Sequence, residues 1–363
     1  MRVLLPISLD RWKNPISTLL RACVQYNSDI EFHSFSHPQT DEDRELGESF
    51  WQLPNLKLRK PSALVSDRFD IVHTASYSHG NYVASVLAKL RGWGHTRFLD
   101  TMNLEQHPSH PVCWARYKRV LRWVDGFVAV SHAVSRDIRE RVPERFMGVI
   151  PNGVDTELYS NKESNPNDMP PAMHDIQPGY PLWIASIEPR KHPEVYLELA
   201  RNNPSITFVA LGHPMGSEGD EMMKKWKQCP NLRWLGGLPR RQAKAILSQA
   251  GVLVFPSERE GLSLAMIEAV AMGVPIIAQP KSSMPELVIP GKNGELVDAD
   301  NLTEWENAIQ KWQEPRSCDQ QKSLAELRAQ ALHQYNWQFV GSEYGKIYKA
   351  IMQKQPKIYK VIA

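Results

Sequence analysis

Two glutamates in one stretch, Glu260 and Glu268, are the residues of this sequence whose types and spacing are best suited to chemistry. The stretch, residues 252–278, reads as an apolar strand, a polar loop and a helix that stops at Gly273. Within that helix only Ser263 and Glu268 are polar, and burying an unpaired carboxylate costs several kcal/mol. A pair of ligand hydroxyls, such as those of a ribose, would satisfy Glu268. A core arginine or a neighbouring loop is the alternative partner, and both interpretations stay open.

Anion-binding groups surround this pair in the sequence. The backbone N–H groups of residues 261–263 are free at the start of the helix, where anions bind. Arg190 and Lys191 follow another apolar run directly, and Pro193 opens a helix at its preferred first position. The forked guanidinium and the point charge of lysine suit a diphosphate. Two solvated loop cations are the alternative.

The elements that must position these groups alternate regularly along the chain. Short apolar runs alternate with amphipathic segments, a pattern typical of parallel βαβ units. The expected strands are 3–7, 30–35, 71–74, 98–101, 127–131 and 149–150, then 182–187, 207–211, 232–235, 252–255 and 276–278. The expected helices are 16–26, 81–90, 112–124, 133–141, 194–201, 218–228, 241–249 and 263–272.

A change of composition divides the chain. Residues 159–181 hold five prolines and four side-chain amides without periodicity, which is typical of a linker. We therefore expect one Rossmann-like domain over 1–158 and a second over 182–335. Since ligands of open parallel sheets bind at the carboxyl ends of the strands, the cleft between the domains is the expected site.

Composition excludes several other classes. At about 150 residues per domain, 363 residues predict two domains, and 42% hydrophobic with 23% charged residues excludes disorder of the whole chain. Basic and acidic residues are nearly balanced, with 20 against 18 through residue 160 and 23 against 22 after it. This balance argues against a nucleic-acid partner. Four isolated cysteines, no long apolar run and no leader-like N-terminus predict a protein that is kept in the cytoplasm.

The long motif has a counterpart among known proteins. The run P-S-x-x-E-G-L-S-L-x-x-x-E-A-x-A-x-G-x-P, which begins at Pro256, resembles the signature of the retaining glycosyltransferases of family 4. V-A-V-S at 128–131 and I-P-N-G-V-D at 150–155 match that family in order and spacing, and Trp337 lies in a closing segment, 336–363, that resembles its last helices. The resemblance implies an α/β, GT-B fold: two doubly wound Rossmann-like domains facing across a cleft, the first on the acceptor side, the second binding the donor. The segment 336–363 would cross back to the first domain.

The resemblance also implies roles for single residues. Glu268 would bind the ribose of the donor, Arg190 and Lys191 its diphosphate, and Glu260 the transferred sugar. The fixed cations and helix-end N–H groups would stabilise the charge that develops on the leaving diphosphate. No metal is required for this, no Asp-x-Asp motif is present, and no cofactor is expected. The full donor-binding set is Arg190, Lys191, Gly212, Leu238, Gly261, Leu262, Ser263, Leu264 and Glu268, and the catalytic pair is Glu260 and Asn103.

Three departures from the family pattern affect this interpretation. Residues 185–187 replace the usual G-R-L, so Arg190 would substitute for the missing arginine, and residues 8–12 lack the usual glycine pair. Asn103 stands where many members have a histidine, and it can hydrogen-bond a sugar but cannot act as a base. In a retaining, front-face mechanism the leaving phosphate can take the acceptor proton instead.

The acceptor side carries weaker signals. His73 ends an expected strand and His107 lies in a loop after Asn103, so both are candidate acceptor contacts, although a structural or solvated histidine is the alternative for each. The segment 112–124 is basic and aromatic, so it either rests on an anionic membrane or is a surface helix with an apolar core face. We favour the surface helix.

The sequence thus predicts a cytoplasmic retaining hexosyltransferase, with peripheral contact at the inner face of the membrane as an open alternative. Its expected partners are a nucleotide-sugar donor, with UDP as the first choice of nucleotide, and a glycan or lipid-linked acceptor. The alternative is a degenerate, non-catalytic sugar-nucleotide-binding protein. A GT-B isomerase or phosphorylase has no support, because no motif for a cofactor-binding lysine is evident.

Overall fold

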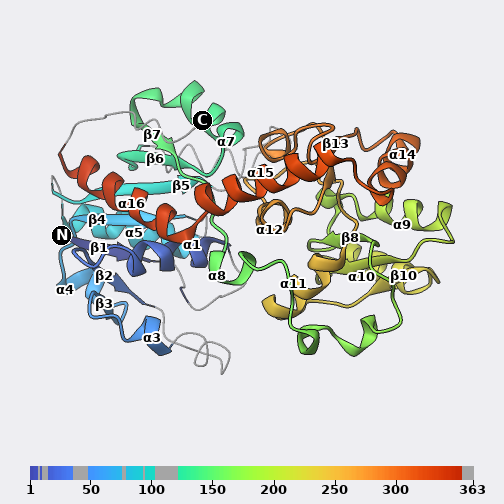
Figure 1. Cartoon of the computed structure of the whole chain (residues 1–363). Coiled ribbons are helices and arrows are strands. Elements are labelled where there is room, and N and C mark those ends of the chain that lie inside the picture. Colours follow the sequence, from blue (N-terminus) through green and yellow to red (C-terminus); the bar gives the residue numbers. More distant parts are fainter. Residues whose placement is uncertain are drawn as a thin grey trace. The chain divides into compact units, whose positions relative to one another are not determined.

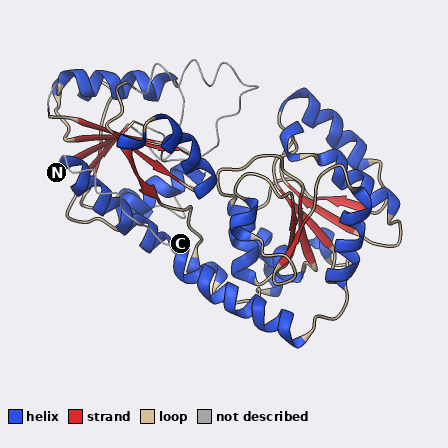
Figure 2. Ribbon diagram, turned by 90° about the horizontal axis from the view of Figure 1, so that it is seen from above, coloured by secondary structure: helices blue, strands red, loops and turns tan. Residues whose placement is uncertain are grey.

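The computed structural model describes residues 1–6, 9, 15–35, 48–75, 79–92, 95–102 and 122–353, and the structural statements below refer to these residues. The chain forms two compact units (Figure 1). Unit 1 comprises Met1–Gly153 and Trp337–Ala363, and unit 2 comprises Val154–Asn336. Each unit is a parallel sheet with helices on both faces (Figure 2).

The sheet of unit 1 has seven strands in the order β3-β2-β1-β4-β5-β6-β7. Their bounds are β1 Arg2–Leu5, β2 Glu31–Ser34, β3 Leu56–Leu58, β4 Ile71–Thr74, β5 Arg97–Met102, β6 Gly126–Ala129 and β7 Phe146–Val149. The helices are α1 Pro15–Gln25, α3 Glu48–Trp51, α4 Ala63–Ser66, α5 His79–Arg91, α7 His132–Arg141 and α16 Trp337–Met352. The strand order reverses between β1 and β4, so these two strand ends form the switch point where ligands bind in doubly wound sheets.

The last described helix, α16, completes unit 1 by packing along α1. A β-carbon on Gly341 would lie 2.4 Å from the carbonyl oxygen of Ala22, and one on Gly345 would lie 1.8 Å from Oδ1 of Asn27. Asn27 is buried, and its Nδ2 donates to the carbonyl oxygens of Cys23 and Gly341 at 2.8 Å each. The two glycines therefore permit a helix contact too close for any side chain.

The sheet of unit 2 has six strands in the order β10-β9-β8-β11-β12-β13. Their bounds are β8 Pro181–Ile184, β9 Phe208–Leu211, β10 Leu232–Trp234, β11 Val252–Phe255, β12 Ile276–Ala278 and β13 Gly294–Leu296. The helices are α8 Thr156–Tyr159, α9 Pro193–Asn202, α10 Gly216–Lys227, α11 Arg240–Gln249, α12 Leu264–Met272, α13 Met284–Leu287, α14 Leu302–Gln313 and α15 Cys318–Gln334. Here the strand order reverses between β8 and β11.

Tryptophans fill much of the core of unit 2. Four of them are at most 1% exposed, namely Trp183, Trp226, Trp305 and Trp312. Trp183 and Trp226 meet edge to face with 5.4 Å between ring centroids, a preferred arrangement for aromatic pairs. Large rigid side chains therefore hold the sheet between its two helical layers.

Within the described residues, the strands and helices predicted from periodicity agree with the structure to within a few residues, and the differences have local causes. The predicted helix 112–124 lies outside these residues apart from its last three positions. Strands β3 and β13 were not predicted, because three-residue strands show no period. Helices α14 and α15 were not predicted either, and in α15 only Leu324 and Ala331 are buried, too few to show an apolar stripe.

The expected linker, residues 159–181, lies within unit 2. Met173, Ile176 and Tyr180 are buried, and the hydroxyl of Tyr180 donates to the carbonyl oxygen of Ile246 at 2.7 Å. These apolar side chains anchor the segment in unit 2, although its polar and proline-rich composition resembles a linker. Across the described residues, no helix combines the length and the apolar character needed to cross a membrane.

Candidate functional site

The switch point of unit 2 brings two of the predicted site loops together. Strands β8 and β11 are neighbours, with Leu182 opposite Leu253, so both carboxyl ends reach the same edge of the sheet. The loop after β8 carries the short 3-10 helix Pro189–Lys191, and the loop after β11 carries Glu260. The backbone N–H of Glu258 donates to the carbonyl oxygen of Arg190 at 2.9 Å, which ties the two loops to each other.

Glu260 is the centre of this cluster and is 8% exposed. Its Oε1 accepts hydrogen bonds from Nζ of Lys191 and, at 2.7 Å, from Oγ of Ser257. Nη1 of Arg190 lies 3.6 Å from the same oxygen. The hydroxyl of Ser282 donates to the backbone carbonyl of Glu260 at 2.6 Å, so the main chain is held as well. The Glu260 carboxylate is therefore fixed in position, and it lies against Arg190 and Lys191, the two residues predicted to bind a diphosphate.

Arg190 is anchored by a second acid. Its Nη2 donates to Oε1 of Glu188 at 2.8 Å, and its Nη1 donates to the carbonyl oxygen of Arg259 at 2.9 Å. The hydroxyl of Ser186 donates to the same Glu188 oxygen at 2.6 Å. Ser186, one of the residues that depart from the family pattern, therefore orients the acid that holds Arg190.

Lys191 is the more buried cation, with 7% of its surface exposed. Burial lowers the pKa of Lys191, and the charge of Arg190 acts in the same direction, while Glu260 and Glu188 oppose the change. The ammonium group also lies 5.2 Å from the ring centroid of Phe255. Two cations and two carboxylates thus form a locally balanced network at the strand ends.

The helix after Glu260 begins next to the network, as predicted. Ser263 caps α12, and its Oγ accepts from the backbone N–H of Met266. The first helical residue is Leu264, while Gly261 and Leu262 are buried in the turn before it. The predicted residues 261–264 therefore lie together at the N-terminus of α12, directly after Glu260 in the chain.

Glu268 is half-buried in α12 and has a partner that the sequence did not suggest. The hydroxyl of Tyr159, a residue that is 2% exposed, hydrogen-bonds the Glu268 carboxylate. Burial raises the pKa of Glu268, whereas the charge of Arg240 and the Tyr159 hydrogen bond oppose the rise and Asp155 adds to it. One side of this carboxylate is therefore satisfied by the protein, so the alternative of a protein partner is partly correct.

Two further donor-site predictions fall at strand ends of the same sheet. Gly212 follows β9 with φ of +137°, and a β-carbon there would lie 1.8 Å from the carbonyl oxygen of Ala185, so only glycine fits. Leu238 is half-buried in the turn between β10 and α11.

His73 does not lie where an acceptor could reach it. The side chain is 0% exposed, with Nδ1 2.7 Å from the hydroxyl of Tyr348 and Nε2 2.9 Å from Oγ1 of Thr101. Burial lowers the pKa of His73 to about 3, so the ring is neutral. The prediction of an acceptor contact at His73 is wrong, because both nitrogens bind the protein interior and α16 covers the ring.

The other acceptor-side predictions lie outside the described residues. These are Asn103, His107, the segment 112–124 apart from its last three residues, and the loop 8–12 apart from Leu9.

Sequence reasoning missed several residues of the network. Ser257 had a local signal, since it stands three residues before Glu260 in the motif, and Glu188 had one in the charge pair Glu188–Arg190. Tyr159 had no local sequence signal, because it lies more than a hundred residues from its partner Glu268 and within the expected linker.

Comparison with known proteins gives two family matches. The family described as "Glycosyl transferases group 1" matches residues 174–333, and the one described as "Glycosyltransferase Family 4" matches residues 22–158. Each family match falls almost wholly within one unit of the structure.

Curated relatives are distant. The MMP α-(1→4)-mannosyltransferase of Mycolicibacterium hassiacum is 27% identical over 242 residues, which are 64% of this chain and 56% of the relative. The D-inositol 3-phosphate glycosyltransferase of Mycolicibacterium smegmatis is 25% identical over 41% of this chain and 36% of its own length. The chain thus spans about half the length, or less, of these two relatives.

Solved structures resemble the whole chain. HepE of Anabaena, in complex with UDP and glucose, has a TM-score of 0.77 at 16% identity and covers 96% of this chain and 100% of its own. Sucrose-phosphate synthase of Thermosynechococcus elongatus has a TM-score of 0.72 at 16% identity, covering 98% and 100%. This likeness concerns the fold, and it confirms the predicted GT-B class with its two doubly wound α/β domains.

Proposed function

Because the chain belongs to family 4 of the glycosyltransferases, we propose that it transfers a hexosyl group from a nucleotide-diphosphate sugar to an acceptor with retention of configuration. UDP is the nucleotide we propose, since the similar HepE structures are complexes with UDP, with UDP-glucose and with UDP and glucose. Unit 2 would hold the donor.

One observation carries the proposal: Arg190, Lys191 and Glu260 meet at the switch point of the unit 2 sheet. Crevices at such points are where doubly wound sheets bind nucleotides. Two cations held by carboxylates keep a fixed geometry, and a fixed positive charge stabilises an anion without reorganising as the charge grows. The start of α12 adds the partial positive charge of a helix N-terminus beside them.

The roles follow from this arrangement. The leaving diphosphate would lie against Arg190 and Lys191, and its growing charge would be stabilised there as the glycosidic bond breaks. Glu260 would hold the transferred sugar and keep Lys191 oriented. Glu268 would accept hydrogen bonds from the ribose hydroxyls, with Tyr159 holding its other side. No metal ion or cofactor forms part of this proposal.

The acceptor side belongs to unit 1 in this proposal. Asn103 would hydrogen-bond the reacting sugars, and the leaving phosphate would take the acceptor proton, so no protein base is needed. The acceptor we propose is a glycan or a lipid-linked saccharide. The enzyme would work in the cytoplasm, at the inner face of the membrane when the acceptor is lipid-linked.

The test is nucleotide binding and donor turnover by the purified protein. UDP-, GDP- and ADP-sugars are titrated by calorimetry, and slow donor hydrolysis is followed with and without a chelator. Glu268→Ala should abolish nucleotide binding, because the ribose loses its acceptor, whereas Glu218→Ala on the exposed face of α10 should bind like the wild type. Undiminished affinity in a folded Glu268→Ala protein contradicts the site, and binding without any turnover contradicts the enzymatic function.

A further inference from the structure

Unit 2 has a groove of about 710 Å³ at the edge of its sheet opposite to Arg190, Lys191 and Glu260. Its lining includes Pro178 and Gly179 just before β8, Gly251 just before β11 and Gly273 at the end of α12. These positions precede strands, whereas Arg190 and Glu260 follow them. The groove therefore lies at the amino edge of the sheet and is separate from the proposed donor site.

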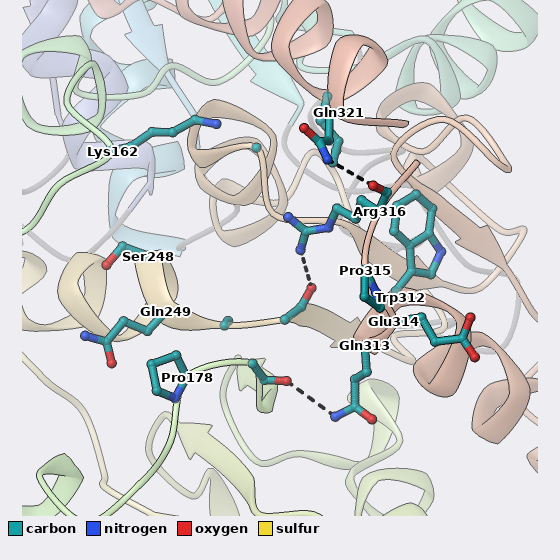
Figure 3. A pocket seen from close by; sticks show the side chains of 15 residues that line it. Lys162, Pro178, Ser248, Gln249, Trp312, Gln313, Glu314, Pro315, Arg316 and Gln321 are labelled. Atoms are coloured by element: carbon teal, nitrogen blue, oxygen red, sulfur yellow. Dashed lines mark hydrogen bonds between the residues drawn. The ribbon is translucent and has the colours of Figure 1, made fainter. Parts of the chain in front are cut away.

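Three cations gather at one end of this groove. Lys162 and Arg316 line it and extend toward the same space (Figure 3). A β-carbon placed on Gly273 would lie 3.2 Å from Nζ of Lys162 and 3.8 Å from Cδ of Arg328, so the third cation is close to the first. Burial lowers the pKa of Lys162, and the positive charges of Arg328 and Arg316 lower it further.

The protein does not neutralise this charge. Among the described residues none of the three cations has an acid within ion-pair distance, in contrast to Arg190 and Lys191. Glu314 is the acid of the groove lining, and in Figure 3 its carboxylate points away from Arg316. The carboxyl end of α12 contributes about half a negative charge. About two and a half positive charges are left over after the helix end is counted.

Hydrogen-bond donors are also left over. Arg316 uses Nη2 to donate to the carbonyl oxygen of Gly251 at 3.0 Å, while the rest of its guanidinium has no acceptor among the described residues. Nε of Arg328 is buried and has no hydrogen-bond partner among the described residues, although its Nη2 donates to the carbonyl oxygens of Tyr159 and Ser160. The ammonium group of Lys162 is likewise without a partner there. Oxyanions are the acceptors that such donors prefer.

We propose that this groove binds a small phosphorylated molecule, with its phosphate held by Lys162 and Arg316 and attracted by the charge of Arg328 beside them. The volume lies within the range of about 300–1,000 Å³ typical of small-molecule sites, so it has room for a body the size of a sugar beyond the phosphate. The side chains of Ser248, Gln249 and Gln313 would face the polar part of that body, and Pro178 and Pro315 its apolar part.

Calorimetry with inorganic pyrophosphate tests the groove and separates it from the donor site. The wild type should bind two pyrophosphates. Lys162→Gln/Arg316→Gln should weaken one of these sites about tenfold or more, because charge-assisted hydrogen bonds are lost. Lys225→Gln/Arg201→Gln removes the same charges from exposed positions on α10 and α9, and it should leave both sites unchanged.

The outcomes of the two proposals differ. If Arg190→Gln removes one site and the groove variant the other, both proposals hold. Binding that depends on Lys162 and Arg316 but not on Arg190 supports the groove and contradicts the donor site. Binding that is unaffected by the groove variant overturns the groove proposal. A lipid headgroup offers the same phosphate, so co-sedimentation with phosphatidylglycerol vesicles that is lost in the groove variant would overturn the small soluble ligand.

Discussion

Asp100, on strand β5, should make unit 1 less stable as the pH rises toward neutrality. The carboxylate is 4% exposed, and its Oδ1 accepts a hydrogen bond from Oγ1 of Thr74 at 2.8 Å. Burial raises the pKa of Asp100 from 3.8 to about 7, against the opposing hydrogen bonds from Thr74 and from the backbone of Thr101. No cation of the described residues forms an ion pair with it, so the charged form is poorly compensated.

The magnitude follows from proton linkage. Between pH 4 and 7 the folded protein binds more protons than the unfolded chain, so the free energy of unfolding falls as the pH rises and levels off above 7. At about 1.4 kcal/mol per pKa unit, the penalty is about 4 kcal/mol at pH 8 and about 2 kcal/mol at pH 5. Asp100→Asn keeps an oxygen for Thr74 and removes the charge. It should therefore stabilise unit 1 by about 2–3 kcal/mol more at pH 8 than at pH 5.

Hydrogen exchange of the β4 and β5 amides measures this effect in unit 1 alone, because it reports the local free energy of opening. Protection factors of the variant and the wild type are compared at equal pH, so the intrinsic exchange rate cancels. Glu140→Gln removes an exposed acid of α7 in the same unit and should show no such pH dependence. A difference between Asp100→Asn and wild type that is equal at pH 5 and pH 8 would refute the reasoning.

Two other substitutions test contacts on which the site and the fold depend. Tyr159→Phe removes a hydrogen bond that lowers the pKa of Glu268, so UDP binding should be lost at a higher pH on the acid side than in the wild type. Calorimetry from pH 5 to 8 measures this shift, and an identical pH profile counts against the ribose role of Glu268. Gly345→Ala puts a β-carbon 1.8 Å from Oδ1 of Asn27 and should destabilise unit 1 by about 1–3 kcal/mol. Thermal unfolding measures it, and an unchanged melting temperature shows that α16 is not tightly packed on α1.

Local signals predicted the positions of the residues at the switch point of unit 2 well. The long motif located Glu260, the start of α12 and its end at Gly273, because strand, turn, cap and helix stop lie within one stretch of about twenty-five residues. Arg190 and Lys191 were found for the same reason, since they follow a strand end directly. What joins the two loops is sheet order, and β8 lies beside β11 although β9 and β10 separate them in the chain.

Contacts between distant segments were not predictable. His73 lies near the end of a strand, which is typical of an active-site residue. Tyr344 and Tyr348 of α16 nevertheless bury its ring, and Tyr348 lies 275 residues further along the chain. Tyr159 reaches Glu268 from a segment whose composition resembles a linker. The sequence around His73 and the sequence around Glu268 contain no pattern that indicates these tyrosine partners, so the contacts became apparent only in the folded structure.

The division of the chain has a consequence for the order in which the protein is made. Unit 2 is one continuous stretch, Val154–Asn336, and it can fold as soon as that stretch has left the ribosome. Unit 1 is synthesised first but lacks α16 until residue 352 has been added, so α1 lacks its packing partner and the ring of His73 stays uncovered in the meantime. The N-terminal unit is therefore the last to be completed, and the nascent chain carries an open unit 1 throughout the synthesis of unit 2.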